Sequence, residues 1–275
     1  MTTTSVYANL DKTEFAGKLL SATGAVWLTT AFLGQWLFAY YILVFYGGHA
    51  IDGDWAAWSK RMIHGFIDGD WAGNAAVFIH ILLAFTITFG GPLQLIPAVR
   101  KHFPVFHRYN GRMYIATTLI MSVASIYMIW SREAVIGGLS GQLGTTLDGL
   151  LIIAFAVLTL KFAMARRFDV HQRWALRLFI VVSGVWFFRV IRGFWILIND
   201  GTSPGTNGTL TGPFDMVLNF AGYLLPLLLL EVYFRAKDSG NQTAQLAMSV
   251  VTLGLTIGLG LGIYSAAQIF WLPNI

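Results

Sequence analysis

The chain has 275 residues, of which 56% are hydrophobic and only 11% are charged, and its formal net charge is +5. A soluble domain has about a quarter charged residues, so this chain cannot surround a core with polar groups, and much of its apolar surface must face lipid. The absence of cysteine excludes disulfides, thiolate metal sites, iron–sulfur clusters and a cysteine nucleophile.

Seven long apolar runs follow one another along the chain, separated by short polar segments. Each is close to the length of about 20 residues that crosses the hydrocarbon core of a bilayer. The sequence therefore predicts an all-α fold, a polytopic transmembrane helical bundle that forms a single membrane domain over residues 1–275. The predicted spans cover residues 22–46, 75–99, 113–130, 147–164, 174–198, 216–233 and 246–270.

Lysine and arginine are shared unevenly between the two ends of these spans. Thirteen lie at one side, before the first span and around the second, fourth and sixth connections, whereas the other side has only Lys60, Arg61 and Arg132. Because basic residues concentrate on the cytoplasmic side, we expect residues 1–21 to form a cytoplasmic arm and the C-terminus to lie outside, in a bacterial inner membrane. Basic residues in this pattern indicate contact with membrane lipids and no nucleic-acid-binding face.

The outer connection, residues 48–74, contains an internal repeat. The sequence from Ile51 to Ala56 recurs from Ile67 to Ala72, and a histidine precedes each copy, at His49 and His64. The Asp-Gly pairs favour turns and the tryptophans suit an interfacial anchor. A metal site is the alternative, because oxygen and imidazole ligands are clustered, although the spacing fits no EF-hand loop.

Polar residues within the spans are few, and His80, Arg189 and Arg192 are the most unusual. An ionised side chain in hydrocarbon costs at least about 2.5–3.5 kcal/mol, so such groups normally face the bundle interior. The two arginines share one helical face and lie at a depth similar to that of His80. We expect them either to clamp an anion, such as a quinone oxygen or a haem propionate, or to reach the headgroups. The other polar residues are Gln35, Gln94 and Glu231.

Two denser polar clusters lie at the basic side. One extends from His102 to Tyr114 and contains His107, Arg108 and Arg112. The other extends from His171 to Arg177 and contains Arg173. Each places a histidine near the start of a helix together with arginines, which the positive end of the helix dipole disfavours, so an anionic partner is expected.

His107 and His171 could be the axial ligands of haem b, with the neighbouring arginines facing its propionates. A quinone is the alternative occupant, and a copper or zinc ion held by His102, His107 and His171 is another. His80 could serve as a further ligand or as a proton group.

The two signatures His107-Arg-x-x-Gly-Arg-x-Tyr114 and His171-x-Arg-Trp-x-x-Arg177, with His80 and the Gly91-Pro92-Leu-Gln94 segment, resemble a bacterial family of multi-span membrane proteins catalogued as a domain of unknown function. The resemblance covers residues 75–192 and leaves out the ends and the repeat. It implies a helical bundle in which the histidine and arginine positions are distinctive, and it implies no particular reaction.

These residues favour a membrane redox protein, or a subunit of a redox complex, that binds haem b or a quinone between the second, third and fifth spans. The alternative is a non-enzymatic structural or assembly subunit of a larger membrane complex, whose histidine and arginine clusters bind lipid or metal. A transporter is less well supported, since only Gly90-Gly91-Pro92 suggests a broken helix. Gly254, Gly258, Gly260 and Gly262 in the last span predict close helix packing.

Overall fold

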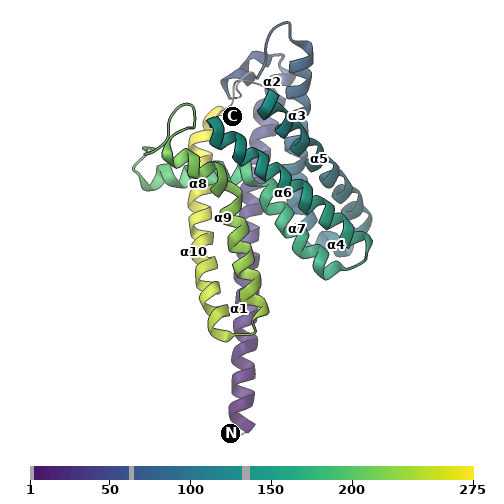
Figure 1. Cartoon of the computed structure of the whole chain (residues 1–275), viewed down its shortest axis with the longest axis vertical. Helices are drawn as coiled ribbons and strands as arrows, with labels where there is room; N and C mark the ends of the chain where they lie inside the picture. Colours follow the sequence, from purple (N-terminus) through teal and green to yellow (C-terminus); the bar gives the residue numbers. More distant parts are fainter. Residues whose placement is uncertain (1–2, 62–64, 132–136) are drawn as a thin grey trace.

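The computed structural model describes residues 3–61, 65–131 and 137–275, and every regular element in these ranges is helical (Figure 1). The first helix, α1, continues without interruption through a short π-helix into α2. The long elements are α1 (Thr3–Tyr41), α3 (Trp71–Leu95), α5 (Pro104–Ser131), α6 (Gly138–Met164), α7 (Phe168–Val182), α8 (Gly184–Ile198), α9 (Pro213–Asp238) and α10 (Gln242–Ala266).

The described ranges also contain several short helices. They are the π-helix Ile42–Gly47, α2 (Gly48–Ile51), the 3-10 helix Trp55–Lys60, α4 (Pro97–His102), the π-helix Ala267–Trp271 and the 3-10 helix Leu272–Asn274. Six segments among the described residues are long and apolar enough to cross a membrane, and there are seven if the bent pair α7 and α8 is counted as one span. The prediction of an all-α membrane bundle with about seven spans is therefore confirmed.

The predicted fifth span is broken in the middle. The axes of α7 and α8 differ by 58° across Ser183. Each half has 15 residues, a length of about 22 Å, so neither half alone crosses a hydrocarbon core of about 30 Å. The helix interruption expected at Gly90-Gly91-Pro92 was wrong, because α3 continues through Pro92 to Leu95.

The break divides the helices into two groups. On the α8 side, α10 packs against α1 and α8, and α9 packs against α8; on the α7 side, α6 packs against α7 and α5, and α5 packs against α3. Contacts of α1 with α3 and of α9 with α6 and α7 join the two groups. In Figure 1 the two groups meet near α8 and diverge toward the end of the molecule at which α1 begins. The polar pair Gln35 and Ser183 lies at the break, where Gln35 Nε2 donates to Ser183 Oγ at 2.7 Å and Ser183 Oγ donates to the Phe179 carbonyl.

The predicted separation of charge is present in the fold. One end, which we call the basic end, contains the start of α1, α4 and the α6–α7 and α9–α10 connections (Figure 1). The opposite end, the acidic end, contains the repeat and the α8–α9 connection. Arg132 lies outside the described residues. The assignment of the basic end to the cytoplasm stays a prediction.

Two glycines, one from each helix, allow α8 and α10 to approach closely. A Cβ atom on Gly193 would lie 2.8 Å from the Ala266 backbone nitrogen, and one on Gly262 would lie 2.7 Å from the Val190 carbonyl oxygen. The close packing predicted for the glycines of the last span is therefore present at Gly262. It is not present at the other three, Gly254, Gly258 and Gly260, which have no atom within 4 Å of an added Cβ.

Candidate functional site

Two arginines of α7 are paired with two carboxylates of α9. Arg177 donates from Nε and Nη2 to the two oxygens of Glu231, at 2.6 and 2.9 Å. One turn away, Arg173 donates from Nη1 and Nη2 to Asp238, at 2.7 and 2.6 Å. Both pairs are bidentate, which is the strongest arrangement of a guanidinium and a carboxylate. The anionic partners expected for Arg173 and Arg177 are therefore protein carboxylates.

Phe234 lies between these two ion pairs. The guanidinium carbons of Arg173 and Arg177 are 5.0 and 5.1 Å from the centre of its ring, and Arg177 also lies 4.7 Å from the Trp174 ring. Ring faces attract cations, so this stack fixes the planes of both guanidinium groups. The signature His171-x-Arg-Trp-x-x-Arg177 thus attaches α7 to α9.

His171 of α7 lies on the side of this helix that faces α6, opposite the ion pairs, and His107 of α5 lies near it. Nδ1 of His171 is 3.0 Å from the carbonyl oxygen of Thr159, so the neutral ring has its proton on Nδ1 and a free lone pair on Nε2. His171 and Arg100 are both near enough to His107 to interact with it electrostatically. The structure therefore brings together the two histidines that the sequence singled out.

Gln94 of α3 selects the tautomer of a neutral His107 ring when its amide is turned so that its oxygen faces the Asn110 and Gly111 donors. Its amide nitrogen faces two acceptors, the carbonyl oxygen of His107 at 3.1 Å and Nδ1 of His107 at 3.2 Å, while its oxygen accepts from Asn110 and Gly111. A ring that accepts at Nδ1 has its proton on Nε2 when neutral. His107 thus offers an N–H donor from Nε2, whereas His171 offers an acceptor.

The remaining basic residues of this end do not converge on a common point. His102, Arg108 and Arg112 are exposed, and Arg112 lies 5.7 Å from the Tyr109 ring. Within the described residues, no group of three histidine or acidic side chains is arranged to hold a metal ion. The proposed metal ligands His102, His107 and His171 therefore do not form such a group.

At the acidic end, His80 of α3 and Arg189 of α8 lie near one another, as their predicted depths imply. Arg189 donates to the Val185 carbonyl at 2.9 Å and lies 5.4 Å from the Phe38 ring. Arg192 has a buried Nε without a hydrogen-bond partner among the described residues. Neither arginine pairs with a described carboxylate, so the expected anion clamp stays a prediction.

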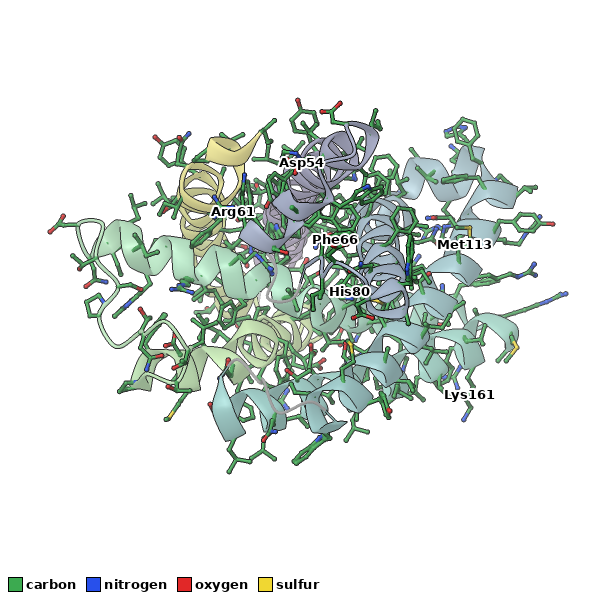
Figure 2. All side chains as sticks on the ribbon, turned by 90° about the horizontal axis from the view of Figure 1, so that it is seen from above. Asp54, Arg61, Phe66, His80, Met113 and Lys161 are labelled. Atoms are coloured by element: carbon green, nitrogen blue, oxygen red, sulfur yellow. The ribbon has the colours of Figure 1, made fainter. Side chains whose placement is uncertain are left out.

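The two copies of the repeat have different structures. In the second copy, Asp70 accepts from the Gly73 backbone nitrogen at 2.9 Å and caps α3. In the first, Asp54 lies 3.3 Å from His49 and caps no helix with its side chain. His64 lies outside the described residues. Seen from above, Asp54 and Arg61 lie on the same side of the bundle as His80 (Figure 2).

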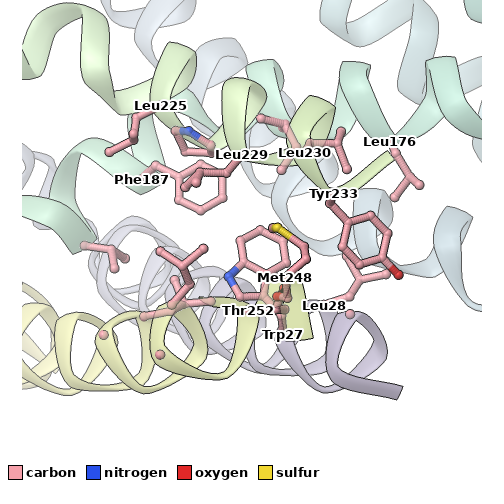
Figure 3. A pocket seen from close by; sticks show the side chains of 18 of the residues that line it. Trp27, Leu28, Leu176, Phe187, Leu225, Leu229, Leu230, Tyr233, Met248 and Thr252 are labelled. Carbon is pink, nitrogen blue, oxygen red and sulfur yellow. Dashed lines mark hydrogen bonds between the residues drawn. The ribbon is translucent and has the colours of Figure 1, made fainter. Parts of the chain in front are cut away.

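A cavity of about 600 Å³ lies among α1, α7, α8, α9 and α10, on the other side of α7 from the histidines. Apolar side chains form nearly all of its wall, including Trp27, Phe187 and Leu229 (Figure 3). Gly254 and Gly258 line it as well, so their missing side chains create part of the space. Polarity is concentrated toward the basic end, where Tyr233 and Lys237 contribute to the wall.

Sequence reasoning missed Asp238 and the cavity. Asp238 lies at the very end of α9, where an acidic residue among basic ones gives no signal by itself. Glu231 was recognised as an unusual polar group, but a single sequence does not reveal its partner. The cavity depends on which faces of five helices meet, and hydropathy does not report this.

Comparison with known proteins places the chain in context. The family model described as "Predicted membrane protein (DUF2306)" matches residues 77–219, which is more than half of the chain. The match extends from α3 to the first residues of α9 and includes both signatures, in agreement with the resemblance noted over residues 75–192. No curated protein and no solved structure matches the chain.

Proposed function

The chain belongs to the DUF2306 family of predicted membrane proteins, and from this basis we propose that it is a membrane redox protein, or a subunit of a redox complex, that binds a quinone. The observation that carries the proposal is the apolar cavity among α1, α7, α8, α9 and α10. This is a different place from the site expected between the second, third and fifth spans, since no described residue of α3 or α5 lines it. Ligand sites in proteins usually measure about 300–1,000 Å³ and have apolar walls with a few polar groups. The cavity has these properties.

The shape and polarity of the cavity suit a molecule with a long apolar part and a polar ring. Tyr233 donates its hydroxyl to the Leu20 carbonyl at 3.3 Å, and the Lys237 ammonium lies 5.9 Å from the Tyr233 ring. A quinone carbonyl at this end could accept from the ammonium group, while the isoprenoid part would occupy the space beside Gly254 and Gly258.

The hydrogen bonds of His107 and His171 argue against haem b. An axial ligand presents the lone pair of one ring nitrogen while the other ring nitrogen donates to a carbonyl or carboxylate. His171 meets this requirement through Thr159, but His107 does not, because Gln94 donates to its Nδ1 and leaves the proton on Nε2. Neither histidine lines the cavity, which lies on the other side of α7, so no role in quinone reduction is assigned to them.

Quinone extraction from purified protein tests the proposal. The protein is isolated from its native membrane in mild detergent, and bound quinone is quantified by chromatography with absorbance detection. In Gly258→Leu the added Cβ has no described atom within 4 Å, so the helix can accept it, and the rest of the leucine side chain fills the cavity. Bound quinone should therefore be lost. Gly260→Leu is the matched control, because Gly260 is equally unobstructed but does not line the cavity, and it should retain quinone.

The same preparation distinguishes the alternatives. A Soret band that disappears in His107→Ala and His171→Ala would establish haem b, and stoichiometric copper or zinc would establish a metal site. Phospholipid in the cavity with neither quinone nor chromophore, together with co-purifying large subunits, would replace the redox proposal by the structural or assembly role.

A further inference from the structure

A buried carboxyl group lies in the middle of the membrane domain, at Asp148 of α6. Asp148 is ten residues from the first residue of α6, about 15 Å along the axis, which is about half of the hydrocarbon thickness. Its Oδ1 is buried and has no hydrogen-bond partner among the described residues. Its Oδ2 lies 3.0 Å from where a Cβ of Gly184 would be. The carboxyl group is therefore placed against the break between α7 and α8.

Glycines let three helices meet around this carboxyl group. A Cβ on Gly144 of α6 would lie 2.6 Å from the Asn219 carbonyl of α9, and one on Gly222 of α9 would lie 3.2 Å from the Gly184 carbonyl of α8. Tyr223 is almost fully buried at this junction, and its hydroxyl donates to the Gly144 carbonyl at 3.1 Å. The carboxyl group thus lies at the junction of α6, α8 and α9.

No described basic side chain neutralises Asp148. From α9 the titratable group that faces it is Tyr223, and the first residue of α8 beside it is a glycine. The charged groups of α7, Arg173 and Arg177, are bound to α9 carboxylates at the basic end. From α5, the buried hydroxyls of Thr118 and Ser122 donate to their own helix. A carboxylate cannot stay ionised in such surroundings without a partner, so the neutral acid is favoured.

Polar side chains lie between this carboxyl group and the acidic end. Ser140, Gly144 and Asp148 are four residues apart in turn and lie along one face of α6. Asn219 donates from Nδ2 to Ser140 Oγ at 3.0 Å, and both residues are only partly buried. Further from the acidic end, the Tyr223 hydroxyl, which donates to the Gly144 carbonyl, is the next polar group in this row.

We propose that Asp148 is a proton-binding site in the membrane interior, which exchanges its proton with the acidic end through the row formed by Ser140, Asn219 and Tyr223. A proton suits the site better than a metal cation, because a hard cation requires several oxygen ligands, whereas the described neighbours supply one carboxyl group. Intramembrane carboxyl groups beside discontinuous helices are typical of proton-coupled membrane proteins. The proposal does not depend on quinone binding.

Labelling with a lipid-soluble carbodiimide tests the protonation of Asp148 in the unmodified chain. Dicyclohexylcarbodiimide reacts with protonated carboxyl groups in apolar surroundings and leaves a stable adduct that peptide mass spectrometry locates. We expect labelling at Asp148 that declines as the pH rises, and no such labelling in Asp148→Asn. Labelling that occurs elsewhere while Asp148 stays unmodified would overturn the proposal.

Infrared difference spectra recorded between two pH values in proteoliposomes test the exchange itself. We expect a carbonyl band of a protonated carboxyl group that shifts on labelling with ¹³C-aspartate, is lost in Asp148→Asn and persists in the exposed control Asp200→Asn. Asn219→Leu should slow the exchange without removing the band. If no such band appears in the difference spectra, the protonation of Asp148 does not change with pH and proton exchange is refuted.

Discussion

The two ion pairs between α7 and α9 allow a comparison in which burial is the main variable. Both are bidentate, and they are one helical turn apart. The side chains of Arg177 and Glu231 are 17% and 35% exposed, whereas those of Arg173 and Asp238 are 41% and 52% exposed. Exposed pairs contribute about 0–1 kcal/mol, but removal of one partner of a buried pair costs about 3–5 kcal/mol.

We therefore expect Glu231→Gln to reduce the free energy of unfolding by about 2–3 kcal/mol, since Arg177 would keep its charge in a mostly buried position without a counterion. Asp238→Asn should cost about 0.5 kcal/mol, because solvent can hydrate Arg173. The folded-to-unfolded ratio would fall by a factor of about 30 or more in the first variant and by a factor of about 2 in the second.

Equilibrium unfolding in mixed detergent micelles, followed by circular dichroism and tryptophan fluorescence, measures both variants. The double variant Arg177→Met with Glu231→Leu provides the internal control. It removes both charges, so it should recover most of the stability lost in Glu231→Gln. Equal losses in Glu231→Gln and Asp238→Asn, or a double variant less stable than the single one, would refute the reasoning from burial.

Two further comparisons test the packing and the repeat. Gly193→Leu should destabilise the protein strongly, because its Cβ would meet backbone atoms of α10, whereas Gly260→Leu should be nearly neutral; thermal unfolding in detergent checks both. Asp70→Ala should cost about 1 kcal/mol through loss of the α3 cap, and Asp54→Ala, which removes no cap, should cost less. Similar losses in the two aspartate variants would contradict the different roles assigned to the two copies.

Hydropathy and charge were sufficient to predict the number and order of the spans, because each helix must bury about 20 apolar residues in lipid. The break at Ser183 could not be predicted in this way, since both sides of it are apolar and a change of direction leaves hydropathy unaltered. Asp148 was not singled out from the sequence for a related reason. The predicted span began at residue 147, whereas α6 begins at Gly138, which moves the carboxyl group into the membrane.

The candidate sites were predicted only in part. His107 and His171 were expected to lie close together because α5 and α7 both begin at the basic end, and in the structure they are near enough to interact electrostatically. The partners of Arg173 and Arg177 lie more than 50 residues further along the chain, at Asp238 and Glu231. Such pairs depend on the rotation of each helix about its axis, which the positive-inside pattern does not determine.

The extensive packing of α1 against α10 affects the synthesis of the protein. About 200 residues separate the end of α1 from the start of α10. At a synthesis rate of about 5–20 residues per second, α1 is therefore made about 10–40 s before α10 begins to form. During that interval Gln35, which is almost fully buried in the finished protein, lacks its partner Ser183 until the fifth span has been made. Until then, the Gln35 amide must find hydrogen-bond partners other than the one that it has in the finished structure.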